Sequence, residues 1–253
     1  MTRSQLFAAL AENPVDLDLT GVDFTDQDLS GMDLSSTTLD NAKLLWATLE
    51  RASFQGVNAE GVRLDDAAAA GADFYHANLH GANLWDGDFQ RCNFRGANLE
   101  GANLKTADLR GADLTRANLR GANLEGADLR GANLEDANLR GANLKGAKMD
   151  RANLEGAMLR DAVLRAAKMD GANLQLANLQ SADLEWAHFP DEGVASYNHL
   201  KAGRRVAFPY AHFPGADFRG ANLRGANVKS AYAEGSTIGQ ANLEGTDVTG
   251  MVG

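Results

Sequence analysis

The sequence predicts an all-β solenoid, in which the chain coils into a stack of four-sided turns behind a short N-terminal capping helix. Three observations carry this prediction. A large, mostly apolar residue, here called the centre, recurs at every fifth position, and alanine usually stands two places before it. Polar residues stand between the two and directly after the centre, as in ANLRGANLEGADLRGANLEDANLRGANLKGA over residues 117–147. Glycine often ends the group of five, where unusual backbone angles cost little.

The period of five excludes a helix and favours short straight sides. Five residues of an α-helix advance by about 500°, so the apolar positions would drift by about 140° per group. In an extended chain, by contrast, successive side chains alternate between two faces, which suits an apolar, polar, apolar run followed by a corner. If four sides close a square, each turn contains four groups of five, and successive turns stack at about 4.8 Å.

The N-terminal segment 1–16 is expected to cap this solenoid. The stretch TRSQLFAALAEN predicts a short helix with Leu6, Phe7 and Leu10 on one face, and an Asn-Pro pair marks its stop. A solenoid needs such a cap because its terminal turn has no neighbour to cover its core.

The repeats then fall into two blocks that differ in register. Centres recur without a slip through residues 17–189, and a second series runs through the C-terminal turns, residues 206–253. The step from Phe189 to Phe208 is not a multiple of five. We therefore expect residues 190–205 to loop out and shift the register.

Composition and charge restrict the function classes. The 253 residues carry a net charge of -10 and include a single cysteine, Cys92, at an inward position, so no internal disulfide is possible. Residues 1–40 contain one basic and eight acidic residues, whereas residues 101–189 contain twelve of each. No apolar stretch of about 18 residues and no secretory leader are visible. A cytoplasmic protein that binds neither a membrane nor nucleic acid directly is therefore expected.

The iterated A[DN]LxG motif, as in GADLRGANLEDANLRGANL, resembles that of the pentapeptide-repeat proteins. The resemblance covers residues 17–189 and 206–250, and it implies a right-handed quadrilateral β-helix without a cofactor. One branch of that family consists of acidic rods that mimic DNA, bind DNA gyrase or topoisomerase IV and protect them from inhibitors. The opening LDLTGVDFTDQDLSGMDLS is also similar to repeat modules of secretion-system-associated proteins. A structural or interaction module of a larger bacterial assembly is therefore the alternative.

Candidate catalytic groups do not converge in the sequence. No GxxxxG copy continues as a phosphate-binding GK[ST], and His76 and His80 fall on a corner and on the following side. Some β-helices cleave polysaccharides with paired carboxylates, so this class remains a third alternative. At equivalent positions of successive turns, however, Asp128 is expected over Lys148 and Arg130 over Asp150, in a charge lattice that satisfies itself. The sequence therefore predicts a protein that is not an enzyme and holds no metal.

Four features are candidates for binding a protein partner. Acidic residues form a ring around the first turn, arginines recur at one position of successive turns, and aromatic residues follow the centres of one turn, with His80 between them and Trp46 two turns earlier. A smaller apolar group replaces polar residues late in the repeats. The acidic ring is Asp18, Asp23, Asp28 and Asp33; the arginines are Arg120, Arg140 and Arg160; the aromatic residues are Tyr75 and Trp85; and the apolar group is Met158, Val163 and Leu176.

The C-terminal end is the candidate surface for a homodimer. The sequence TGMVG that follows Val248 is too short and too rich in glycine to form a capping helix. The last turns are balanced in charge, so two copies could meet there without strong repulsion. The residues expected at this end-to-end interface are Ile238, Leu243, Val248 and Met251.

Overall fold

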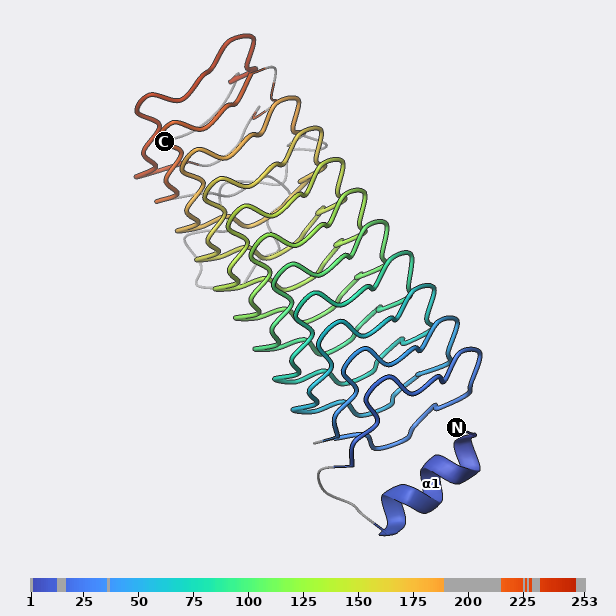
Figure 1. Cartoon of the computed structure of the whole chain (residues 1–253). Coiled ribbons are helices and arrows are strands. Elements are labelled where there is room, and N and C mark those ends of the chain that lie inside the picture. The colour runs from blue at the N-terminus through green and yellow to red at the C-terminus, as the bar shows by residue number, and fades with distance from the viewer. Residues whose placement is uncertain are drawn as a thin grey trace, which may run out of the picture.

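The computed structural model describes residues 2–12, 17–35, 37–188, 215–224, 226, 228 and 233–248. Figure 1 shows a rod of stacked, four-sided turns with helix α1 (Arg3–Glu12) at its N-terminal end. No helix among these residues is long and apolar enough to cross a membrane. The predicted loop 190–205 and Met251 lie outside the described residues.

Each turn pairs with the next through single-residue parallel bridges. On the first side Asp18 pairs with Thr38, which pairs with Asn58, and the other three sides repeat the same step. The pairs stay single because a corner interrupts the extended backbone after every side. We call the four sides faces A, B, C and D, in the order of the bridge columns that begin at Asp18, Asp23, Asp28 and Asp33.

The core is a continuous column of apolar side chains along the rod axis. All centre residues from Leu19 to Leu184 are buried, and most residues two places before them are buried too. Phe54, Phe74 and Phe94 stack over one another with 4.8 Å between ring centroids and 6° between ring planes. The distance between rings therefore equals the spacing of paired strands, so every turn buries its side chains against the next.

Cys92 belongs to this core. Its Sγ donates to the backbone oxygen of Ala69 at 3.0 Å, and burial raises the pKa of the thiol to about 12. The side chain therefore acts as a small apolar residue, as its inward position predicts.

The helical cap differs in detail from the prediction. Leu6 is fully buried and Leu10 packs partly against the core, but Phe7 is 70% exposed, so the three residues do not share a buried face. The buried contact is narrow because α1 meets only the open end of one four-sided turn. Arg3 supplies the polar part of the cap and donates to the backbone oxygens of Asp28 and Ser30, both at 3.0 Å.

The register changes once between the described parts of the rod. Asn178 pairs with Asp217, and Asp183 pairs with Asn222, so on these two faces the step falls one position short of two full turns. Beyond this point the ordinary step returns, with Asp217 paired to Thr237.

Candidate interaction surfaces

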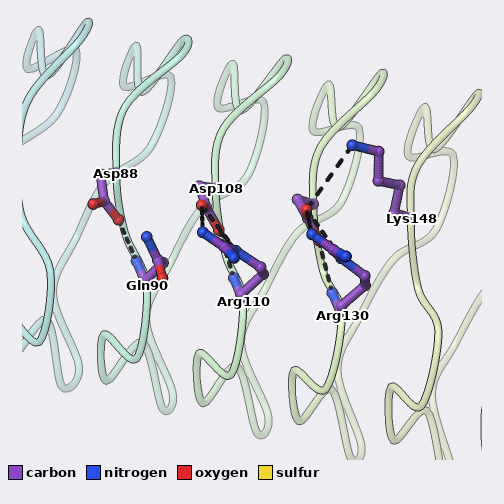
Figure 2. Close-up of polar contacts among 7 residues, drawn as sticks. Asp88, Gln90, Asp108, Arg110, Arg130 and Lys148 are labelled. Carbon is purple, nitrogen blue, oxygen red and sulfur yellow. Dashed lines mark hydrogen bonds and ion pairs between the residues drawn. The ribbon is translucent and has the colours of Figure 1, made fainter.

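Face C carries a regular array of charged pairs (Figure 2). Arg110 binds Asp108 of its own turn with 2.6 Å between Nη2 and Oδ2, and Arg130 binds Asp128 in the same way. The predicted stacking of Asp128 with Lys148 of the next turn is present, with 4.0 Å between Oδ2 and Nζ. Arg130 and Asp150 occupy equivalent positions of adjacent turns, as predicted, and the hydrogen bond from Asp128 and, less strongly, the charge of Asp150 raise the pKa of Arg130. The closest partner of Arg130 is nevertheless Asp128, because residues i and i+2 of an extended side project together and allow a two-point contact within the turn.

The next turns of face C are less well satisfied. Burial and then the charge of Asp150 raise the pKa of Asp170, and one oxygen of Asp170 is buried without a hydrogen bond. His188 Nδ1 lies 3.5 Å from that oxygen. A carboxylate pair in a catalytic site would need removal from water, but the Asp170 side chain is 45% exposed. The described residues also contain no group of three or more metal-ligating side chains.

The acidic ring lies around the first turn, beside α1. In each case the Ser or Thr two residues later lowers the pKa of the Asp carboxyl through hydrogen bonds from its side chain and its backbone N–H. Two of the four also face a cation: Arg3 lies 2.7 Å from Asp28, and Lys43 lies 3.7 Å from Asp23. These hydrogen bonds join Asp18 to Thr20, Asp23 to Thr25, Asp28 to Ser30 and Asp33 to Ser35.

The three arginines form a column on face A, which we call the arginine column: Arg120, Arg140 and Arg160. The Arg120 Nη1 lies 2.8 Å from Glu100, one turn earlier, and the Arg160 Nε lies 3.4 Å from Asp161. Arg140 forms no ion pair with any described residue. The column therefore places one unpaired guanidinium between two partly paired ones.

The predicted aromatic pair does not form one patch. Tyr75 is 39% exposed on face D, where its ring contacts His76, whereas Trp85 is 41% exposed on face B. Sequence reasoning missed Trp186, which is 62% exposed at a corner. The signal was present, because a large apolar residue at a corner position cannot point inward.

The C-terminal end of the rod exposes its core. Ile238, Leu243 and Val248 are 41–47% exposed, whereas the four centres of the preceding turn, from Phe218 to Ala233, are at most 8% exposed. Within the described residues, the backbone N–H groups of Ile238 and Leu243 donate no hydrogen bond. This end thus presents both apolar side chains and an open β edge.

The repeat identifies the class of protein. Residues 18–56, 49–86, 88–126, 117–156, 157–191 and 211–250 match the pentapeptide repeats, with eight copies. The chain therefore belongs to the pentapeptide-repeat family, as the sequence motif predicts. Proteins of this family form right-handed quadrilateral β-helices, and they generally serve as structural or interaction modules.

Solved structures of the family resemble the chain. HetL, a pentapeptide-repeat protein involved in heterocyst differentiation regulation from the cyanobacterium Nostoc sp. strain PCC 7120, is 27% identical; the match covers 99% of this chain and 96% of HetL, with a TM-score of 0.64. A trypsin-treated variant of QnrB1, a plasmid-mediated fluoroquinolone resistance protein, is 19% identical over 88% of this chain and 87% of that chain, with a TM-score of 0.33. Among curated proteins, none matches the chain significantly.

Proposed function

We propose that this protein is a non-enzymatic, rigid scaffold of the cytoplasm that presents flat faces to a protein partner. The observation that carries the proposal is the unbroken core from Leu19 to Leu184, hydrogen-bonded from turn to turn. Such a core holds the outer side chains in fixed columns at a spacing of about 4.8 Å. A partner with matching charges meets a surface that needs little ordering, which favours binding.

The acidic N-terminal half is the part that we assign to a basic partner surface. Its supporting features are the acidic ring and a second set of acids, Asp40, Glu60 and Glu100, in one column of face A. In its most specific form, the proposal is that this half imitates DNA and binds DNA gyrase or topoisomerase IV. Such a mimic competes with duplex DNA and protects the enzyme from quinolones.

Charge-neutral variants test this assignment. Changing Asp40→Asn, Glu60→Gln and Glu100→Gln together should weaken binding to gyrase at low salt, where exposed charges are least screened. The matched control changes Glu125, Glu135 and Glu155 to Gln, in the half with balanced charge. Equal supercoiling inhibition and quinolone protection by both variants, or none by the parent protein, would exclude the DNA-mimic form.

A regulatory role through a different protein is the second candidate. The match to HetL, which is involved in heterocyst differentiation regulation, extends over nearly the whole of both chains. This likeness, at 27% identity, supports a regulatory interaction protein as the second candidate, beside an interaction module of a larger assembly such as a secretion-associated one. Failure to bind gyrase, together with specific binding of another protein by the same acidic half, would select this candidate.

We also propose that two copies meet end to end through the C-terminal turns. The exposed Ile238, Leu243 and Val248 support this assignment, because burial against a second copy would cover them as the next turn would.

A further inference from the structure

We propose that the arginine column, together with Met158 and Leu176, is a docking site for an acidic protein segment that carries an apolar side chain. The inference rests on the proposed scaffold role and adds a second partner surface, which begins on face A where its acidic column ends, at the ion pair of Arg120 with Glu100. The site combines the arginine column of face A with two exposed apolar side chains, Met158 on the same face and Leu176 at the corner beside it. The repeat pattern alone requires neither feature.

The structure contains two kinds of arginine, which differ in the residue two places earlier. Where that residue is Asp, as before Arg110, Arg130 and Arg219, the guanidinium binds the carboxylate of its own turn within 2.6–2.7 Å. Figure 2 shows two of these pairs. Before the members of the arginine column stand Asn118, Asn138 and Met158, which offer no carboxylate. Among the described residues Arg140 has no carboxylate partner, and Arg120 and Arg160 each have one outside their own i–2 position, Glu100 and Asp161. Each guanidinium therefore keeps N–H donors for an external anion.

The column also concentrates like charge. The bridges that join Asn118 to Asn138 and Asn138 to Met158 place the three arginines in successive turns of one face. At about 4.8 Å per turn, positive charges in line repel one another, and water screens them only in part. Carboxylates laid along the column would remove this repulsion and gain charge-assisted hydrogen bonds.

Met158 interrupts a hydrogen-bonded ladder at the same place. Side-chain amides of face A donate down the rod from Asn138 to Asn118 and so on to Asn58, which donates to Asp40. A methionine cannot continue this chain, and its side chain is 41% exposed. Leu176, at the corner that leads into the next turn of face A, is 60% exposed. An apolar partner side chain would cover both.

The same face argues against a nucleic acid as the occupant. Directly before the arginine column, the equivalent positions carry Glu60, His80 and Glu100. A long polyanion laid along face A would meet these carboxylates after three turns, or about 14 Å. A short acidic segment, such as one helix with glutamates three and four residues apart, fits within that length.

Titration by nuclear magnetic resonance tests the proposal. The probe is a synthetic helical peptide of about 16 residues with glutamates on one face and leucine near one end. We expect shifts of the side-chain Nε–Hε signals of the arginine column and of the Met158 methyl group, with little change at Arg110 and Arg130. Shifts at Arg110 and Arg130 alone, or no shifts in low salt, would overturn the inference and leave the gyrase test of the acidic half unaffected.

Paired variants distinguish specific binding at the arginine column from general electrostatic attraction of the acidic peptide to the protein. Arg120→Gln with Arg140→Gln should weaken peptide binding about tenfold, whereas Arg110→Gln with Arg130→Gln, which removes the same charge, should change it less than about twofold. Met158→Asn restores the repeat residue, so it should raise the melting temperature and yet weaken binding. Unchanged affinity in that variant would show that Met158 has no part in the site.

Two further probes decide between occupants. An oligothymidylate of about 12 nucleotides should bind more weakly than the peptide, because it would reach the acidic part of face A. Tighter binding of the oligonucleotide would overturn the assignment to a protein segment. Salt-sensitive self-association that Arg120→Gln with Arg140→Gln abolishes would instead assign the column to a second copy of this chain.

Discussion

At the residue scale, the corners follow a rule that couples equivalent positions of successive turns. A corner side chain points along the rod toward the corner of the next turn, and glycine often stands there. A Cβ on Gly61 would lie 2.7 Å from Asn41 Oδ1, and one on Gly96 would lie 2.6 Å from His76 Cε1. Glycine at these corners therefore serves two purposes: it accepts a positive φ and it leaves room for a neighbour.

Comparison of two glycines of one turn distinguishes the effect of positive φ from the effect of steric contact. Gly96 and Gly101 both have φ of +67°, but nothing lies within 4 Å of a Cβ on Gly101. Alanine at either position should lower the free energy of unfolding by about 1 kcal/mol through backbone strain, and Gly96→Ala by roughly 1 kcal/mol more through contact with His76. Urea denaturation measures both. Adding His76→Ala should remove the extra loss, and no rescue would disprove the steric explanation.

Asp170 gives a pH-dependent prediction. Its pKa is raised in the folded state, so its contribution to stability is fully present below the ordinary value of 3.8 and is lost as the pH rises through the folded pKa. Asp170→Asn should therefore raise the melting temperature at pH 7 by about 1 °C, a small effect because the group is half exposed. The gain should vanish near pH 3.

A matched substitution checks the sign. Asp128→Asn on the same face removes the two-point contact with Arg130, so it should lower the melting temperature at pH 7. A melting temperature that falls in both variants would show that Asp170 is stabilised by its neighbours, contrary to the geometry.

Among the structural elements, α1 lies where a preceding turn would lie and supplies some of the hydrogen bonds that such a turn would make. Within the rod, backbone carbonyls of each turn accept N–H groups of the preceding turn, as Asp40 accepts from Gly21 and Asn58 accepts from Leu39. The first turn has no preceding turn. Arg3 replaces two of these donors at the carbonyls of Asp28 and Ser30 and binds the Asp28 carboxylate with a third contact.

Substitution of Arg3 should loosen one end of the rod. A lysine offers a single point charge and cannot reach both carbonyls in a fixed geometry, so Arg3→Lys should behave much like Arg3→Ala. Hydrogen exchange should become faster in residues 17–35, while the central turns keep their protection, because repeat proteins unravel from their ends. Asp28→Asn, which keeps both carbonyl contacts, should have a smaller effect. Equal exchange in all three variants and the parent would contradict the cap.

The sequence predicts the features that depend on the repeat period, but not those that depend on contacts between particular side chains. Centres, inward alanines and the stacking of every fourth group could be read directly, because burial imposes a strict period on the chain. The contacts of Arg3 could not be predicted, since they depend on where a helix lies against an open edge. The pairing of Arg130 also depended on competition between two nearby acids, which spacing does not decide. For the arginine column, the sequence located the residues, but only the structure distinguished them from arginines bound within their own turn.

At the scale of the whole molecule, the two ends of the rod differ in kind. The N-terminal end has an acidic ring and helix α1, and the first centres of the rod, Leu19 and Phe24, are fully or almost fully buried. The C-terminal end exposes Ile238, Leu243 and Val248. Charge and apolar exposure are thus separated along the axis, so the acidic end favours a basic partner and the apolar end favours self-association.

The apolar end leads to the last prediction, an end-to-end dimer. Two copies related by a two-fold axis can bury the exposed centres of their last turns and satisfy open edges, and little charge opposes them there. Light scattering coupled to gel filtration should give twice the chain mass of 26.9 kDa at micromolar concentration. Because apolar contact is not screened by salt, the dimer should persist at about 1 M salt, unlike any association through the arginine column. Ile238→Asp should yield monomers that keep the β signal, whereas Phe7→Asp, which places the same charge at the exposed Phe7 of the other end, should leave the dimer intact. A monomer for the parent chain, or loss of the dimer in both variants, would rule out pairing through the C-terminal turns.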